Sequence, residues 1–448
     1  MAVLETIAAV ATPPGPGGVG IVRVSGPLSS AIAKGVIGRS PEPRIATLAD
    51  FHGRDGVAID QGIALFFPSP RSFTGDDVLE LQGHGGPVVM DLLLRRTLEL
   101  GARLARPGEF SERAFIHGKL DLTQAEAVAD LIDSTTEAAA RMASRTLHGE
   151  FSRRIHALAD ALIRVRTFVE AAMDFPDEEI DFLAATELCE DLRGLIDQTR
   201  AVMASARQGQ LVREGLQLVI AGPPNAGKSS LLNVLSGTEA AIVTEIPGTT
   251  RDLLRQEIQI DGMPLRIIDT AGLRPSEDPV EREGIRRARD QIDRADRVLW
   301  VFDGIAEPGH ASFDASFLPR QIPVTFVRNK IDLTETRPGR RETDAGVEIA
   351  LSARTGAGMS SLREHLKDIV GFHGAGEGEF MARRRHLDAL RRACNHLESA
   401  AQILAQTAAG ELMAEDLRLA HYALGEITGE FSSDDLLGEI FASFCIGK

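Results

Sequence analysis

Hydrophobic and polar positions follow two different periods along this chain, and each period predicts a different kind of element. In the first part, short apolar or alternating runs at residues 19–25, 63–67 and 78–82 are separated by glycine and proline. Such runs are typical of β-strands, and the glycine and proline between them are typical of turns. We therefore predict an α+β domain over residues 1–118.

From about residue 119 the apolar positions recur at helical spacing instead. One series falls at Leu158, Leu162, Val165 and Val169, with steps of four, three and four. A second series, nearer the other end of the chain, falls at Leu387, Leu390, Cys394, Leu397, Ala401 and Leu404. Because both series mark helices with one buried face, we predict one all-α domain built from residues 119–210 and 372–448.

The segment between the two helical parts, residues 211–371, has the pattern of an inserted domain. Helical sequence alternates with predicted strands at residues 216–221, 265–269, 298–302, 324–327 and 347–351. This alternation is typical of a doubly wound sheet with helices on both faces. The predicted fold class is therefore multidomain α/β, with an N-terminal α+β domain, a helical domain and an inserted doubly wound domain.

The first strand of the insertion leads into a phosphate-binding loop. Gly222-Pro-Pro-Asn-Ala-Gly-Lys-Ser229 fits the P-loop pattern between a strand and a helix that opens near Lys228. Backbone N–H groups of such a loop, together with the positive end of the helix dipole, bind phosphate oxygens. Lys228 is expected to reach the β- and γ-phosphates, and Ser229 to bind Mg²⁺.

Three further motifs follow predicted strands in the order of a guanine-nucleotide site. Asp269-Thr-Ala-Gly272 suits the magnesium shell and a γ-phosphate sensor, although it is weak evidence alone. In Asn329-Lys-Ile-Asp332 the aspartate can accept two hydrogen bonds from guanine, and Ser352-Ala-Arg354 can offer backbone N–H groups to the guanine carbonyl. The set predicts a Ras-like, GTP-binding G domain.

Two segments contain candidate residues for GTP hydrolysis: residues 244–252 and the sequence after Gly272. The threonines and the glycine of residues 244–252 are typical of a first switch loop, which orders over the γ-phosphate. Leu273 stands where Ras-like enzymes carry a water-orienting glutamine. Acidic residues within 277–283 are alternative candidates for that role, and a plain solvated loop is equally compatible with their composition.

Charge and cysteine content bear on the protein's binding partners and on its location in the cell. The net charge of −16 repels nucleic acid at long range, so any nucleic-acid contact is expected to be local. The basic cluster at residues 383–386, with Arg391 and Arg392, suits either a phosphate contact or a solvated helix face. Three cysteines, no secretory signal and no long apolar run predict a cytoplasmic protein that does not span a membrane.

Several motifs together resemble one family over residues 5–448. They are Ala11-Thr-Pro-Pro-Gly-Pro-Gly-Gly-Val-Gly-Ile-Val-Arg23, Leu120-Asp-Leu-Thr-Gln-Ala-Glu126, the phosphate loop, Gly248-Thr-Thr-Arg-Asp252 and the terminal Phe444-Cys-Ile-Gly-Lys448. The chain resembles the MnmE (TrmE) family of tRNA modification GTPases, whose G domain is of the TrmE-Era-like type. The resemblance implies a homodimer formed through an N-terminal folate-binding domain.

For the G domain, the resemblance implies potassium beside the β- and γ-phosphates, where other GTPases use an arginine. The implied potassium ligands are Asn225, Thr244, Ile246 and Thr249, while Ser229 and Thr250 bind magnesium. Glu281 becomes the water-orienting catalytic residue. With the motifs above, the predicted GTP-binding residues are Asn225, Ala226, Gly227, Lys228, Ser229, Ser230, Thr244, Glu245, Ile246, Pro247, Gly248, Thr249, Thr250, Asp269, Thr270, Ala271, Gly272, Asn329, Lys330, Asp332, Ser352, Ala353 and Arg354.

The resemblance also implies a folate site and a tRNA-directed reaction. A 5,10-methylene- or 5-formyl-tetrahydrofolate would contact Arg23, Glu80, Lys119 and Lys448, and Cys445 becomes a candidate catalytic residue. The implied activity adds a carboxymethylaminomethyl or aminomethyl group at C5 of the wobble uridine of certain tRNAs, in a heterotetramer with the FAD-dependent protein MnmG (GidA). Two alternatives are a ribosome-assembly type GTPase and a GTP-loaded switch protein that does not modify tRNA.

Overall fold

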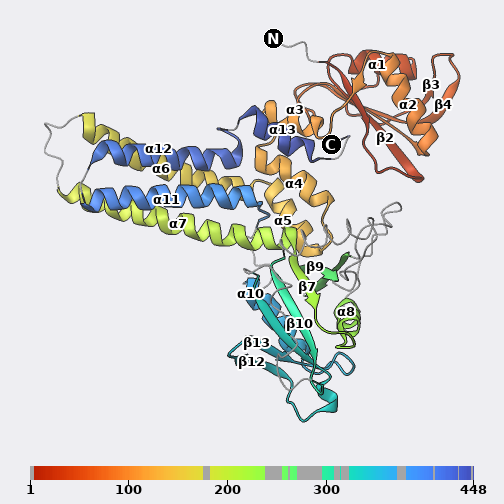
Figure 1. Cartoon of the computed structure of the whole chain (residues 1–448). Helices are drawn as coiled ribbons and strands as arrows, with labels where there is room; N and C mark the ends of the chain where they lie inside the picture. The colour runs from red at the N-terminus through yellow and green to blue at the C-terminus, as the bar shows by residue number, and fades with distance from the viewer. Residues whose placement is uncertain are drawn as a thin grey trace, which may run out of the picture. The chain divides into compact units, whose positions relative to one another are not determined.

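The computed structural model describes most of the chain (Figure 1). The described residues are 5–174, 182–237, 255–260, 263–269, 295–306, 313, 322–370, 380–406, 409–431, 433–444 and 447. They form two compact units. The first consists of Met1–Ala129, Thr146–Asp197 and Arg392–Lys448, and the second of Asp130–Arg145 and Gln198–Arg391.

The unit boundaries fall inside helices, not in loops. These helices are α4 (Leu122–Ile132), α5 (Glu137–Leu147), α7 (Phe182–Glu214) and α11 (Arg384–Gln406). The three predicted parts, with limits at residues 118, 210 and 371, do not coincide with these two units and stay a prediction.

The first unit contains a six-stranded sheet in the order β3-β4-β5-β2-β1-β6. Its strands are β1 (Ile7–Val10), β2 (Gly17–Ser25), β3 (Thr47–His52), β4 (Ala58–Phe67), β5 (Val78–Gly85) and β6 (Arg103–Leu104). All neighbours are antiparallel except β1 and β6. Helices α1 (Ser29–Ile37) and α2 (Pro87–Glu99) pack on the sheet, where Val22, Val24 and Leu79 are fully buried. Because side chains alternate along a strand, Arg23 and Glu80 lie on the opposite face.

The helices of the first unit include α3 (Glu109–Ile116), α6 (Glu150–Asp174), α12 (Gly410–Thr428) and α13 (Asp434–Ala442). The series predicted from spacing in α6 is buried: Leu158 is 2% exposed, Leu162 0% and Val169 4%. Helix α6 packs along α12, and α13 packs on α3. The predicted helical periodicity is therefore confirmed.

The second unit contains a seven-stranded sheet in the order β12-β13-β11-β10-β7-β9-β8. Its strands are β7 (Leu216–Ala221), β8 (Arg255–Ile260), β9 (Met263–Asp269), β10 (Arg297–Asp303), β11 (Val324–Asn329), β12 (Gly339–Thr343) and β13 (Gly346–Ala350). The five central strands are parallel, and only the edge strands β8 and β12 are antiparallel to their neighbours. The order reverses at β7, so the carboxyl ends of β7 and β10 flank the crevice where doubly wound folds bind ligands.

Helices α8 (Lys228–Ser236) and α10 (Met359–Val370) cover this sheet, and a short 3-10 turn, η3 (Ile331–Leu333), follows β11. All five predicted strands are present, and α8 begins at Lys228 as predicted. The predicted α/β fold class is confirmed. Among the helices that the structure describes, none is long and apolar enough to cross a membrane.

Candidate functional site

The phosphate-binding loop joins the end of β7 to the start of α8 through three residues with positive φ. Gly222 has a φ of 138°, Asn225 of 63° and Gly227 of 92°. A Cβ at Gly222 would lie 2.0 Å from the carbonyl oxygen of Val301 on β10. Only glycine fits there, because the loop backbone lies against the neighbouring strand.

Asn329, at the end of β11, connects the phosphate-binding loop to the two predicted base-binding motifs. Its Nδ2 donates to the carbonyl oxygen of Ala226 at 2.9 Å. Its Oδ1 accepts from the backbone N–H of Lys330 at 2.8 Å and of Ala353 at 3.0 Å. The side chain is buried, and a Cβ at Gly227 would lie 2.2 Å from its Nδ2. One amide therefore holds three loops in fixed positions.

Asp332, the predicted guanine-reading carboxylate, is held by the third of these loops. Its Oδ1 accepts a 2.6 Å hydrogen bond from Ser352 Oγ, and Arg354 Nη2 lies 2.6 Å from its Oδ2. The hydrogen bond from Ser352, with the positive charge of Arg354, lowers the pKa of Asp332. The carboxylate is therefore ionised at neutral pH, as an acceptor of guanine N–H groups must be.

Two lysines of the site are folded onto nearby oxygens. Lys228 Nζ donates to the carbonyl oxygens of Gly222 and Pro223, both at 2.9 Å. Lys330 Nζ lies 2.7 Å from Asp303 Oδ2. Burial raises the pKa of Asp303, but the hydrogen bonds from Lys330 and from the backbone N–H of Ile305, together with the charge of Lys330, outweigh burial and lower the pKa. Asp303 was not predicted as part of the site, since its partner lies on the next strand.

Residues proposed to bind metal are only partly within the described chain. Ser229 and Asn225 are exposed at the start of α8 and in the phosphate-binding loop. A hydroxyl and an amide oxygen are suitable ligands for Mg²⁺ and K⁺, so these two side chains fit the predicted roles. The remaining predicted residues of the site lie outside the described residues: Thr244, Glu245, Ile246, Pro247, Gly248, Thr249, Thr250, Thr270, Ala271, Gly272 and Glu281.

In the first unit, Arg23 and Glu80 form an ion pair across β2 and β5. They are opposite one another in the sheet, with Arg23 Nη2 2.9 Å from Glu80 Oε1. The rings of Phe73 and Phe110 flank the guanidinium at 5.7 and 5.8 Å from their centroids. A carboxylate, a guanidinium and two aromatic rings suit a flat heterocycle with amino and carboxylate groups. This donor set fits a folate, and the two phenylalanines were not predicted.

The other predicted folate residues are less fully described. Arg23 Nη1 donates to the carbonyl oxygen of Gly447 at 3.5 Å, which places this glycine beside the ion pair. Lys119 is exposed after α3, and within the described chain it forms no ion pair with Glu80. Cys445 and Lys448 lie outside the described residues.

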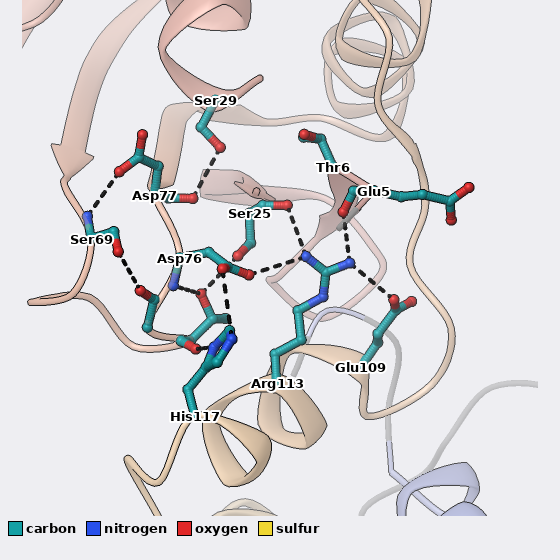
Figure 2. Close-up of polar contacts among 12 residues, drawn as sticks. Glu5, Thr6, Ser25, Ser29, Ser69, Asp76, Asp77, Glu109, Arg113 and His117 are labelled. Carbon is teal, nitrogen blue, oxygen red and sulfur yellow. Dashed lines mark hydrogen bonds and ion pairs between the residues drawn. The ribbon is translucent and has the colours of Figure 1, made fainter. Parts of the chain in front are cut away.

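Arg113 of α3 links several loops of the first unit, and Figure 2 shows its contacts. Its guanidinium donates to the carbonyl oxygen of Glu5 at 2.7 Å and lies 3.2 Å from Asp76 Oδ2 and 3.3 Å from Glu109 Oε1. Burial raises the pKa of Glu109, but Arg103 and the N–H of Arg106 outweigh it and bring the pKa to about 2. The loop that carries Phe73 is thereby attached to α3. No local pattern predicted the contacts of Arg113 with Glu5 and Asp76, because these residues lie 108 and 37 positions away in sequence.

Two family models and several known proteins match this chain. A family model described as "GTP-binding protein TrmE N-terminus" matches residues 6–119, and one described as "MnmE helical domain" matches residues 122–445. The protein named tRNA modification GTPase MnmE of Vibrio cholerae serotype O1 is 59% identical over 450 residues, 99% of each chain.

Two further relatives carry the same name. That of Haemophilus influenzae is 57% identical over 451 residues, covering 99% of this chain and 100% of the relative. That of Yersinia pseudotuberculosis is 58% identical over 456 residues, covering 100% of both chains. Identity at this level over the full length of the chain, with both family models matched, establishes the family. The chain belongs to the MnmE family of tRNA modification GTPases.

Proposed function

We propose that this protein hydrolyses GTP and uses the cycle to drive modification of tRNA. The reaction adds a carboxymethylaminomethyl or aminomethyl group at C5 of the wobble uridine of certain tRNAs, together with an FAD-dependent partner. A tetrahydrofolate derivative donates one carbon. The three-part division at residues 118, 210 and 371, the homodimer and the heterotetramer with the partner belong to the same proposal.

The observation that carries the GTP-binding half is the position of Asn329. Its amide fixes the phosphate-binding loop, the loop of Lys330 and the loop of Ala353 relative to one another. Asp332, which is ionised and held by Ser352, lies in the second of these loops. A site that fixes phosphate and guanine groups at one spacing supports selective binding of GTP.

Hydrolysis is assigned to residues around the γ-phosphate. Lys228 binds the β- and γ-phosphates, Ser229 and Thr250 hold magnesium, and Glu281 orients the attacking water. Asn225, Thr244, Ile246 and Thr249 would hold potassium, which would supply positive charge where phosphate charge develops. The need for Glu281 is supported by Leu273, whose side chain cannot orient water.

The tRNA half of the proposal is supported by the relatives' shared name and by the Arg23–Glu80 pair. Glu80 binds the amino-pyrimidine edge of the pterin, and Phe73 and Phe110 lie beside the ring. Arg23, Lys119 and Lys448 bind the folate carboxylates. Cys445 is assigned to the catalytic step near the folate or the uridine.

Mass spectrometry of tRNA nucleosides tests this function directly. Cells lacking the protein should lose the aminomethyl-type modifications at C5 of the wobble uridine, and the restored gene should return them. GTP turnover of the purified protein should be much faster in potassium than in sodium. Unchanged tRNA with intact GTP turnover would refute the tRNA half and favour a ribosome-assembly or switch role. Equal rates in both salts would refute the role of Asn225.

A further inference from the structure

A buried carboxylate in the second unit binds two arginines from distant parts of the chain. Asp130, near the end of α4, has a side chain that is only 6% exposed. Its Oδ1 accepts from Arg213 Nε and from Arg383 Nη2, both at 2.8 Å. Arg383 belongs to the basic cluster at residues 383–386, and its side chain, which is 14% exposed, is paired with Asp130 through the guanidinium.

The two arginines mark where the chain enters and leaves the nucleotide-binding sheet. Arg213 lies in the last turn of α7, directly before β7, and Arg383 lies directly before α11. The two segments also touch through their backbones, because a Cβ at Gly209 would lie 2.0 Å from the carbonyl oxygen of Phe380. Asp130 therefore ties α4 to both connections of the sheet.

The hairpin β8–β9 lines the same cavity as Asp130 and Arg213. In sequence, it runs between the predicted first switch loop, which ends at Asp252, and the motif that begins at Asp269. Its Ile258 and Leu265 belong to the same buried apolar cluster as Ala139 and Met142 of α5. The same cluster contains Val212, next to Arg213, and Met381, two residues before Arg383, so the hairpin packs with the segments that carry the two arginines.

A cavity of about 400 Å³ separates the hairpin from the ion pairs. Its lining includes Asp130, Arg213, Ile258, Pro264, Arg266 and Met381. Close-packed cores transmit displacement with little room for adjustment, whereas this cavity leaves the hairpin space to move against the cluster.

Burying a carboxylate with two guanidinium groups is a poor way to gain stability alone. The cost of removing charges from water often cancels their attraction, and apolar residues of similar size stabilise as well. What such a cluster adds is a unique geometry, since only one arrangement satisfies all three groups. Networks of ion pairs and packed side chains of this kind can carry coupling between distant sites.

We propose that Asp130 is a positioning residue of the GTPase cycle, which transmits the state of the β8–β9 hairpin to α4. Its carboxylate fixes the entering and leaving segments to α4, and these segments pack with the hairpin through Val212 and Met381, so a change at the nucleotide alters the stability of α4. The inference rests on the proposed function only in taking GTP as the nucleotide that drives the change.

The test compares the full-length protein with Asp130→Asn and with the matched control Asp133→Asn. Asp133 is exposed and lines the same cavity but forms no ion pair in the described chain. Hydrogen exchange of residues 122–132 is measured with GDP and with a non-hydrolysable GTP analogue. In the wild type and in Asp133→Asn, exchange should differ about tenfold between the two nucleotides. In Asp130→Asn this difference should disappear, while GTP hydrolysis stays within about threefold of the wild type.

Several outcomes would overturn the inference. One is a wild type whose exchange in α4 does not depend on nucleotide. Another is an Asp130→Asn protein whose exchange in α4 still depends on the nucleotide. A third is an Asp130→Asn protein whose rate of GTP hydrolysis falls by as large a factor as the nucleotide dependence of exchange. If Asp130→Asn does not fold, Arg383→Gln serves instead, because it leaves Asp130 paired with Arg213. Amounts of modified tRNA are measured in parallel: a wild type that leaves tRNA unmodified refutes the proposed function but not the coupling.

Discussion

The side-chain Nδ2 of Asn329 lies 2.9 Å from the carbonyl oxygen of Ala226, a residue 103 positions earlier in the chain. Replacing Asn329 by alanine leaves that carbonyl and the N–H groups of Lys330 and Ala353 without this partner. Unsatisfied buried groups cost about 1–3 kcal/mol each, so we expect the free energy of unfolding to fall by about 3 kcal/mol. GTP affinity should fall by at least about tenfold.

Urea unfolding and titration calorimetry measure these two effects. The matched control is Asn233→Ala, which removes an exposed asparagine from α8. GTP affinity within about twofold of the wild type in Asn329→Ala would show that the amide does not fix the loops.

Gly227→Ala should abolish nucleotide binding while leaving the chain folded. The added Cβ would lie 2.2 Å from Asn329 Nδ2, and the φ of 92° is unfavourable for alanine. The control is Gly339→Ala, where φ is also positive but no atom lies within 4 Å of the added Cβ. Nucleotide titration followed by fluorescence should show loss of binding only for Gly227→Ala. Equal effects of the two substitutions would assign the loss to backbone strain alone.

Arg354→Ala should strengthen binding of GTP and GDP. Arg354 occupies Oδ2 of Asp332, so a guanine N–H group must displace the guanidinium from this oxygen. The arginine is 73% exposed, and ion pairs of exposed side chains contribute little, because water and salt screen them. Affinity for both nucleotides should therefore rise by about two- to fivefold, measured by calorimetry at low salt and lost at high salt. Weaker binding would mean that Arg354 itself contacts the nucleotide.

Acid should destabilise the second unit through His365. Its ring is buried, its Nε2 shares a 2.9 Å hydrogen bond with Thr325 Oγ1, and burial, with Arg297 and Arg340 nearby, lowers its pKa to about 4. The unfolded state takes up a proton near pH 6.5 and the folded state only near pH 4, so stability is complete above pH 6.5. It falls by about 3 kcal/mol as the pH drops through this window.

Unfolding in urea across that pH range measures the effect. The variant His365→Gln keeps a hydrogen-bond acceptor for Thr325 without an ionisable ring. It should show a flatter dependence of the free energy of unfolding on pH than the wild type. Identical slopes for the two proteins would contradict the assignment.

Glu281→Ala should keep the GTP affinity of the wild type and lose hydrolysis. A water-orienting carboxylate acts on the transition state and adds little to ground-state binding. Single-turnover hydrolysis at saturating GTP in potassium is the measurement, and Glu283→Ala is a control from the same acidic segment. Turnover within a few-fold of the wild type would transfer the role to another residue.

The nucleotide site could be predicted because its signals are local. The strand before Gly222, the helix after Lys228 and the short motifs at strand ends each occupy a few consecutive residues. Strands β8 and β12 were not predicted, since as edge strands they carry many polar residues. The hydrogen bond between Asn329 and Ala226 was not predicted either. The sequence pattern identifies the two loops but does not give the distance between them.

The Arg23–Glu80 pair shows a different limit. The two residues are 57 positions apart, and only the sheet register makes them neighbours. Resemblance to a family suggested their role, whereas their charges alone were compatible with any surface. The cluster of Asp130, Arg213 and Arg383 had no signal in the sequence, since Asp130 and Arg383 are 253 positions apart.

The apolar cluster that packs on the seven-stranded sheet limits how this sheet can be produced as a separate fragment. Ala139, Met142 and Met381 belong to this cluster, although all three lie outside residues 211–371. A fragment cut at those two limits would leave Leu216, Leu265 and their neighbours uncovered, and exposed apolar patches promote aggregation. The smallest piece that can fold with a complete interior is therefore discontinuous in sequence, and joining α5 to the excised sheet through an artificial linker should restore solubility.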